Sequence, residues 1–148
     1  MIRLANINDI AEINDLLFQV QNVHAKLRSD LFKSGGKKYC DEEIKKIIEN
    51  DETPIFVYEL DKKVVGYAFC VINNHNNYKS IYIDDLCTSE EYRAKGIGTA
   101  LFEHVLDYAK CIGCYNVTLN VWTGNDNALK FYKNKDMKVQ KITMEKIL

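Results

Sequence analysis

The sequence predicts an α/β (α+β) domain with a mixed central sheet, and three observations support this class. Apolar runs typical of strands alternate along the chain with amphipathic patterns typical of helices. Two strand-like runs, Ile55–Leu60 and Val64–Asn73, are joined by the short turn at 61–63 and predict an antiparallel hairpin. A strand, a helix and another strand then follow between Ser80 and Trp122, which predicts a right-handed parallel crossover.

The residues before the hairpin predict a short strand, at Ile2–Ala5, and two helices. Asn8 is the expected cap of the first helix, whose apolar residues recur at helical spacing: Ile10, Ile13, Leu16, Leu17, Val20 and Leu27. Asp41 is the expected cap of the second helix, which turns inward Ile44, Ile47 and Ile48.

The residues after the hairpin predict the crossover and one more helix. The first strand of the crossover is Ser80–Thr88, its helix covers about 98–112 with Gly113 as the cap, and its second strand is Tyr115–Trp122. A short helix is expected at about 127–134. The turn after Thr88 thereby lies at the carboxyl end of a strand, where α/β folds bind ligands.

The composition fits one domain over residues 1–148. The chain is 47% hydrophobic, and a single proline, Pro54, leaves no obvious linker. A net charge of −1 argues against a nucleic-acid partner. No apolar run is long enough to span a membrane, and the first residues lack the apolar core of a signal peptide. We therefore expect a cytoplasmic protein with no membrane partner, and a homodimer stays open.

The five cysteines are expected to be reduced thiols, because their number is odd and their spacing fits no disulfide framework. Cys111 and Cys114 form a Cys-x-x-Cys pair, but no second Cys/His pair completes a zinc site. The sequence therefore predicts no metal.

The most specific segment is the turn that opens the long helix, Arg93-Ala94-Lys95-Gly96-Ile97-Gly98-Thr99. Its two glycines allow a tight turn in which successive backbone N–H groups point at one anion. The helix N-terminus adds unpaired donors, and Arg93 and Lys95 add positive charge. The spacing fits neither the dinucleotide-binding Gly-x-Gly-x-x-Gly pattern nor a P-loop. The turn predicts a site for a phosphorylated cofactor.

This turn and three further features resemble the GNAT superfamily of acyl-CoA N-acyltransferases. They are the strand at 81–88, the segment 125–132 that is similar to the family's Asn-x-x-Ala-x-x-Phe-Tyr helix, and the order of elements up to a last strand near Met137–Ile147. The resemblance covers essentially the full chain. It implies acetyl-CoA as co-substrate, and a mostly antiparallel sheet of six to seven strands, splayed between strands four and five and flanked by about four helices.

In this family the pantetheine arm of the acyl-CoA pairs with the fourth strand as an added strand would. The resemblance therefore assigns to Leu86, Cys87 and Thr88 the main-chain contacts with this arm, including one N–H that holds the thioester carbonyl. Asn125 and Ala128 are also assigned to the cofactor. Tyr132 is the expected acid that donates to the leaving CoA thiolate, the alternative being a purely packing role.

The acidic pair Asp84 and Asp85 marks the expected acceptor side. The segment 81–86 resembles the Tyr-x-Glu-Asp-Phe segment of the diamine (spermidine/spermine) acetyltransferases, in which the acids serve the polyamine. A strand bulge would present these carboxylates, with Asp84 as the base acting through water and Asp85 holding the ammonium. The alternative is that one of them is a solvated edge charge. His24, near the end of the first helix, is a further acceptor-binding candidate.

The predicted activity is direct transfer of acetyl to a primary amine of a small cationic molecule, in a ternary complex. A protein or peptide amine as acceptor and a catalytically silent acyl-CoA-binding module are the alternatives. Asn120 stands where the ribosomal-protein N-terminal acetyltransferases carry their basic Glu, which disfavours that acceptor class. Two positions replace a usual glycine: Ala94, which is tolerated there if its φ is negative, and Asp136, a residue type that tolerates the left-handed conformation.

Overall fold

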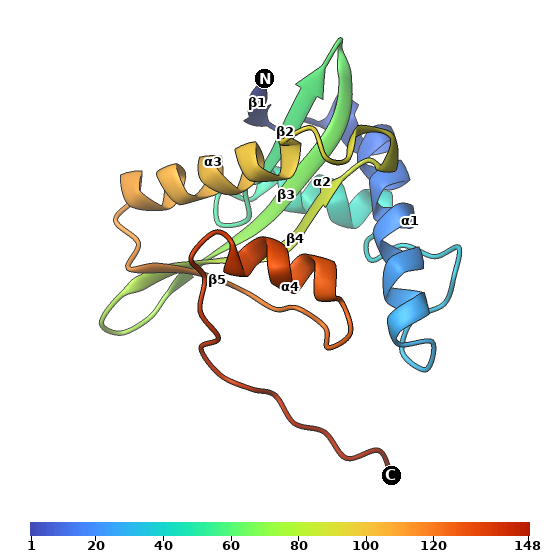
Figure 1. Cartoon of the computed structure of the whole chain (residues 1–148). Helices are drawn as coiled ribbons and strands as arrows, with labels where there is room; N and C mark the ends of the chain where they lie inside the picture. The colour runs from blue at the N-terminus through green and yellow to red at the C-terminus, as the bar shows by residue number, and fades with distance from the viewer.

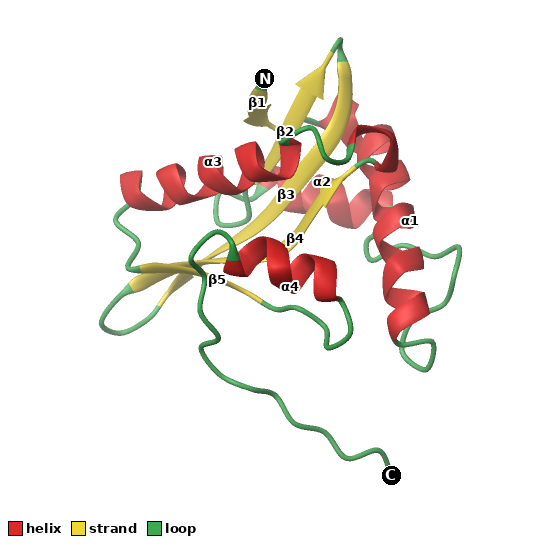
Figure 2. Ribbon diagram, viewed as in Figure 1, coloured by secondary structure: helices red, strands yellow, loops and turns green.

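A computed structural model describes all 148 residues and confirms the α/β class with a mixed sheet. The sheet has five strands in the order β1 (Ile2–Leu4), β2 (Ile55–Leu60), β3 (Lys63–Asn74), β4 (Lys79–Thr88) and β5 (Asn116–Leu119). Neighbours from β1 to β4 are antiparallel, and β5 is parallel to β4. The helices are α1 (Ile10–Leu27), α2 (Asp41–Glu49), α3 (Ile97–Cys111) and α4 (Asp126–Lys133), with 3-10 turns at Ile7–Asp9 and Glu90–Tyr92 (Figures 1 and 2).

Each face of the sheet is covered by helices, and each face has its own core. α3 packs on one face, where it buries Ile97, Leu101, Phe102 and Val105 against strand residues such as Val65 and Ile81. α1 and α2 pack on the other, with a core that includes Ile13, Leu17, Ile44, Val57 and Tyr67. None of the helices combines the length and apolar character needed to cross a bilayer.

A bulge in β4 changes which face its side chains point to. Phe69 of β3 pairs with Asp85 and Cys70 pairs with Ile83, so Asp84 has no partner residue opposite it. Before the bulge, Ile83 belongs to the core on the α3 side. After it, Cys87, four residues further along the strand, belongs to the core on the α1/α2 side. One inserted residue therefore switches the odd-numbered positions of β4 from one face to the other.

Strand β5 pairs only with the first part of β4. The parallel pairing joins Ser80–Ile83 to Asn116–Leu119, and β5 then ends, whereas β4 continues to Thr88 with β3 as its remaining neighbour (Figure 1). The backbone of β4 from the bulge to Thr88 thus lacks a strand partner on its β5 side. The expected splay between the fourth and fifth strands is confirmed.

Two expectations about the end of the chain are wrong. The sheet has five strands rather than six to seven, and residues 134–148 form no helix or strand. The expected last strand near Met137–Ile147 therefore does not form within this chain, because an extended segment becomes a strand only with a ladder partner, and none is paired with it. In Figure 1 this red segment runs away from the body of the molecule.

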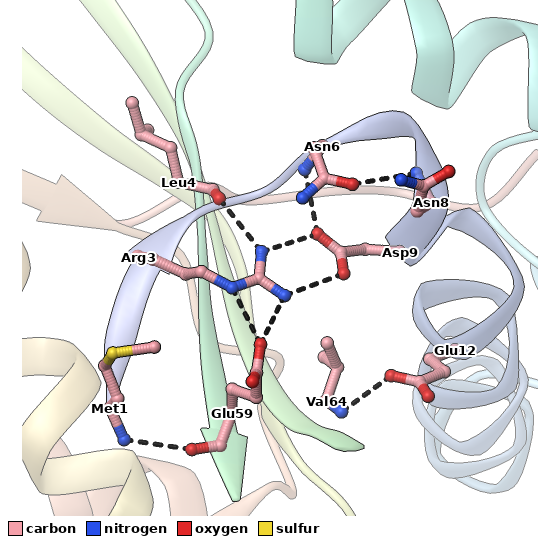
Figure 3. Close-up of polar contacts among 9 residues, drawn as sticks. All are labelled: Met1, Arg3, Leu4, Asn6, Asn8, Asp9, Glu12, Glu59 and Val64. Atoms are coloured by element: carbon pink, nitrogen blue, oxygen red, sulfur yellow. Dashed lines mark hydrogen bonds and ion pairs between the residues drawn. The ribbon is translucent and has the colours of Figure 1, made fainter. Parts of the chain in front are cut away.

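An ion-pair network joins β1, the first 3-10 turn and β2 (Figure 3). The Arg3 guanidinium donates to both oxygens of Asp9, at 2.8 and 2.9 Å, and to Glu59. The hydrogen bond from Arg3 holds the pKa of Asp9 below its ordinary value. Asn6 caps the 3-10 turn, since its Oδ1 accepts from the Asn8 N–H at 2.9 Å. The N-cap position of α1 is Asp9, so the expected cap at Asn8 is wrong.

The cap of α2 also differs from the expectation. Cys40 occupies the N-cap position, and Asp41 is the first helical residue. The Cys40 N–H donates to the Glu43 side chain at 3.1 Å, while the carboxylate of Asp41 accepts from Lys37 at 2.8 Å. Asp41 thereby binds the loop that precedes the helix, through Lys37.

Gly66 of β3 sets how closely α3 packs on the sheet. A Cβ at this position would lie 3.0 Å from the Cys87 carbonyl oxygen and 3.1 Å from side-chain atoms of Ile97 and Leu101. We expect Gly66→Ala to lower the free energy of unfolding by about 1–3 kcal/mol in urea titrations. Gly36→Ala is the matched control, since its nearest contact is 3.6 Å and its effect should stay within about 0.5 kcal/mol. Equal stability of the two variants would contradict this packing argument.

Candidate active site

The turn between β4 and α3 forms a concave backbone segment. Ala94 and Gly96 have φ values of +61° and +79°, on either side of Lys95. The condition of a negative φ at Ala94 is not met, because the chain reverses tightly there. The first α-helical hydrogen bond is made by the Ala100 N–H to the Gly96 carbonyl at 3.0 Å, so the amides from Ile97 to Thr99 precede it. These free donors can hold an anion.

A cavity of about 440 Å³ lies against this turn, between the end of β4, α3 and α4. We call it the glycine-turn cavity. Ten of its lining residues are among those expected to bind the cofactor: Leu86, Thr88, Arg93, Ala94, Gly96, Ile97, Gly98, Thr99, Ala128 and Tyr132. Tyr92 and Phe131 complete the lining. Residues more than 40 positions apart in the sequence thus meet around one space.

Three other residues expected at the cofactor do not line this cavity. The Cys87 side chain is buried on the opposite face of the sheet, where burial raises the pKa of the thiol to about 12. Lys95 lies over the ring of Tyr92, at 5.1 Å from its centroid. Asn125 is the N-cap of α4, and its side chain accepts from the Ala128 N–H at 3.3 Å.

Tyr132 lines the glycine-turn cavity. Its ring packs edge-on against Phe102 and Phe131, which fixes its position on α4. Burial, together with the negative charge of Asp85, raises the pKa of its hydroxyl above the ordinary value. The hydroxyl therefore stays protonated at neutral pH and is able to donate a hydrogen bond.

Asp84, the bulge residue, is already paired with a cation. Its Oδ1 accepts from the Lys38 ammonium at 2.9 Å, and its Oδ2 accepts from the Tyr39 hydroxyl. Both partners come from the segment just before α2. Burial and this hydrogen bond raise the pKa of Tyr39, so its hydroxyl stays protonated as the donor. The carboxylate thus presents an ammonium-binding position.

Asp85 has a different environment from its neighbour. Its Oδ2 accepts from the Tyr67 hydroxyl at 2.7 Å. Burial raises the pKa of Asp85 to about 6, and the Tyr67 hydrogen bond and the Lys38 charge act in the opposite direction. A carboxyl with a pKa close to neutrality is better matched to proton transfer than an ordinary aspartate.

A second cavity, of about 360 Å³, opens beside Asp84. We call it the Asp84 cavity. It lies between α2 and strands β3 and β4, and its lining combines apolar and charged side chains: Tyr39, Glu43, Lys46, Ile47, Thr53, Phe69, Cys70, Val71 and Asp84. Its charged lining residues are Asp84, Glu43 and Lys46. The cavity provides room for a small molecule next to the ammonium-binding carboxylate.

His24 lines neither cavity. Its ring packs against Phe32 at 5.1 Å, and Phe32 in turn packs edge-on against Trp122. Burial, followed by the charge of Lys38, lowers the pKa of His24, which favours the neutral imidazole. The expected role of His24 in acceptor binding stays a prediction.

Sequence reasoning missed Lys38, Tyr39 and Tyr67. Tyr39 contacts Asp84 from 45 positions away, so no local spacing in the sequence connects them. Tyr67 and Phe69 are the two aromatic residues of β3 and alternate along it, and that pattern alone indicates core positions. A tyrosine whose hydroxyl is buried does, however, need a hydrogen-bond partner, and Asp85 provides it.

Comparison with known proteins agrees with this geometry. Residues 20–136 match the Acetyltransferase (GNAT) family. The probable N-acetyltransferase san of Drosophila melanogaster is 31% identical over 129 residues, 86% of this chain, and the chain spans about 60% of that protein's length. The thialysine N-epsilon-acetyltransferase of Mus musculus is 29% identical over 86% of this chain and 71% of its own length.

The fold is also that of a solved protein. The crystal structure of a mutant BH1408 protein from Bacillus halodurans superposes with a TM-score of 0.92, at 30% identity, covering 100% of this chain and 99% of that one. The predicted family, its α+β fold and the parallel β4–β5 pair are confirmed together. The chain belongs to the acetyltransferase (GNAT) family.

Proposed function

We propose that this protein transfers acetyl from acetyl-CoA to a primary amine of a small cationic acceptor. The observation that carries the acceptor class is the Lys38 ammonium bound to Asp84 at 2.9 Å, beside a cavity of about 360 Å³. An ammonium of the acceptor would take the place that Lys38 now occupies. Two adjacent carboxylates disfavour anionic acceptors at this position.

The fit of acetyl-CoA rests on the backbone of two elements. The amides from Ile97 to Thr99 and the positive φ values before them suit the pyrophosphate. The side of β4 that β5 leaves free, from the bulge to Thr88, suits the amide groups of pantetheine, which can pair with it as a strand would. Together they would place the thioester between Tyr132 and the acidic pair.

We assign the proton acceptor to Asp85 and the ammonium-binding role to Asp84, the reverse of the order expected from sequence. Asp84 lines its cavity and already binds the ammonium of Lys38. Asp85 accepts from the buried Tyr67 hydroxyl, and burial raises its pKa to about 6, which is nearer to that of an amine than the pKa of an ordinary aspartate is. Asp85 would accept the proton of the attacking amine, directly or through water, while Asp84 holds the acceptor in place.

Tyr132 would act on the leaving group. As the amine nitrogen forms its bond to the carbonyl carbon, the carbon–sulfur bond breaks and the sulfur leaves as a thiolate. The raised pKa of Tyr132 keeps its hydroxyl protonated, so that it can donate to that sulfur.

Direct transfer is supported over a covalent acyl-cysteine. The thiol of Cys87 has a pKa of about 12 because it is buried, and its Sγ faces the Leu16 carbonyl at 3.9 Å. A thiol in that state offers almost no thiolate near neutral pH. The transfer would therefore take place in a ternary complex of protein, acetyl-CoA and amine.

A protein or peptide amine is the second candidate acceptor. The names of relatives favour it, since one of them is an N-alpha-acetyltransferase 50, from Danio rerio, that is 29% identical over 129 residues. Asn120 argues for the small acceptor, because its side chain donates to the Tyr82 hydroxyl at 3.1 Å and offers no base.

A panel of acceptors tests the proposal directly. We expect release of free CoA from acetyl-CoA to be fastest with diamines and other small polycations, and slow with acidic or uncharged amines. Peptides with free N-termini form the comparison arm of the panel. Preference for peptides would favour the second candidate, and no release with any amine would favour the silent acyl-CoA-binding module.

Removal of the Lys38 ammonium should strengthen binding of the acceptor. In Lys38→Met, Asp84 loses its internal partner, so KM for a diamine should fall about two- to fivefold, the range set by an exposed ion pair. Asp84→Asn should raise KM at least about tenfold. Lys37→Met is the matched control, because the ammonium of Lys37 pairs with Asp41 and not with Asp84. An unchanged KM in both Asp84 and Lys38 variants would refute the acceptor position.

Tyr132→Phe removes the hydroxyl and keeps the ring. We expect turnover to fall about 10²-fold, with little change in acetyl-CoA affinity, because the lost interaction acts on the leaving sulfur. Tyr108→Phe is the control, since that tyrosine packs on Phe56 and lines neither cavity. Wild-type turnover of Tyr132→Phe, measured where chemistry limits the rate, would make Tyr132 a packing residue.

The pH profile tests Asp85. Only the deprotonated carboxylate accepts a proton, so kcat/KM should fall about tenfold per pH unit below about 6 and level off above it. The Tyr67 hydrogen bond lowers the pKa of Asp85, so Tyr67→Phe should move this limb to higher pH. Asp85→Asn should lose the limb. A limb unmoved in Tyr67→Phe and retained in Asp85→Asn would belong to another group.

A further inference from the structure

A lysine of this chain occupies the position proposed for the acceptor. The ammonium of Lys38 lies 2.9 Å from Oδ1 of Asp84, and Asp84 directly precedes Asp85 on β4. Burial raises the pKa of Asp85, and the Tyr67 hydrogen bond and the charge of Lys38 oppose that rise, so Lys38 acts on Asp85 as well. A primary amine of the chain itself thus lies beside both carboxyls that we assign to the acceptor.

Side chains, rather than backbone hydrogen bonds, hold the segment that carries Lys38. Residues 28–40 join α1 to α2 and contain no helix or strand. No backbone–backbone hydrogen bond involves residues 36–39. Tyr39 is held by its hydrogen bond to Asp84, whereas the side chain of Lys38 is 43% exposed. The Lys38 ammonium can therefore leave the carboxylate without disturbing the fold, because an exposed ion pair is weak.

The other lysines near this site have different surroundings. Lys37 donates to Asp41 at 2.8 Å and to Asn14 at 2.6 Å. Lys46 lines the Asp84 cavity from α2, but it forms no ion pair with Asp84. Lys38 is thus distinguished from both by its contact with the acceptor-binding carboxylate.

We propose, as an inference that rests on the proposed function, that the protein acetylates the ε-amine of its own Lys38 when no acceptor is bound. The ammonium would give one proton to Asp85, which passes it to water, and the free amine would attack the thioester carbon. The nitrogen–carbon bond forms and the carbon–sulfur bond breaks. The second proton lost by the nitrogen replaces the one that Tyr132 gives to the sulfur. One amide, one CoA thiol and one proton result from one ammonium and one acetyl-CoA.

Acetylation of Lys38 would change the acceptor site. The amide carries no charge, so Asp84 would lose its internal cation and become free for an ammonium from solution. Transfer within one molecule is favoured, because the amine and the bound cofactor are held close together. The acetylated chain should therefore bind a diamine more tightly than the unmodified chain, as Lys38→Met should.

Mass spectrometry of the full chain after incubation with acetyl-CoA alone tests this inference. One acetyl group should appear on Lys38, at a rate that is independent of protein concentration and is slowed by a saturating diamine. Tyr132→Phe should slow the labelling about 10²-fold. Lys38→Arg should abolish it, and Lys37→Arg, the matched control, should label at the wild-type rate. The acetylated chain should show a KM for a diamine about two- to fivefold lower.

Acetylation of a diamine without any label on Lys38 would overturn the self-acetylation and leave the proposed function intact. Transfer to neither, by a chain that binds acetyl-CoA, would overturn the proposed function as well. A rate that rises with protein concentration would mean transfer between copies. Equal labelling of Lys37 and Lys38, or an unchanged rate in Tyr132→Phe, would mean uncatalysed chemistry. An unchanged KM after acetylation would contradict the release of Asp84.

Discussion

The separation of β5 from β4 after Ile83 is the constraint on which the candidate site depends. Four residue pairs hold the two strands together, and beyond them β4 continues to Thr88 with a neighbour on one side only. Backbone groups inside a protein need hydrogen-bond partners, so this half of β4 is suited to an extended ligand with its own amides. The glycine turn follows at once, and α4 closes the space with Tyr132. The position proposed for the cofactor thus follows from the early end of β5.

The bulge at Asp84 gives the two acidic residues different environments. Without it, neighbouring positions would alternate between the two faces of the sheet, and β4 would keep one set of residues on the α3 side throughout. With it, Asp84 turns to Lys38 and Tyr39 at an open cavity, and Asp85 turns to Tyr67 inside the α1/α2-side core. Two adjacent carboxyls therefore have different partners, an ammonium and a phenol for Asp84 and the buried Tyr67 for Asp85. That difference is the physical basis for giving them separate roles.

The sequence predicts much of this architecture. Apolar periodicity predicts the hairpin and the crossover helix within a few residues, because their cores are local patterns. The turn at 93–99 predicts the cavity, because its two glycines allow the tight turn whose residues line that cavity. The partners of Asp84 and Asp85 are not predictable in this way, because they come from segments 45 and 18 positions away. The segment after α4 has a strand pattern, but pairing depends on a partner that its own sequence does not specify.

Binding of acetyl-CoA along the free side of β4 is the central claim, and an amide NMR titration tests it most directly. With acetyl-CoA, the backbone amides of Leu86–Thr88 and those of Gly96–Thr99 should shift together. With the nucleotide half of the cofactor, which lacks pantetheine, only the amides of the glycine turn should shift. If acetyl-CoA moved the turn amides and left Leu86–Thr88 unchanged, pantetheine would lie elsewhere and the account of the splayed strands would be wrong.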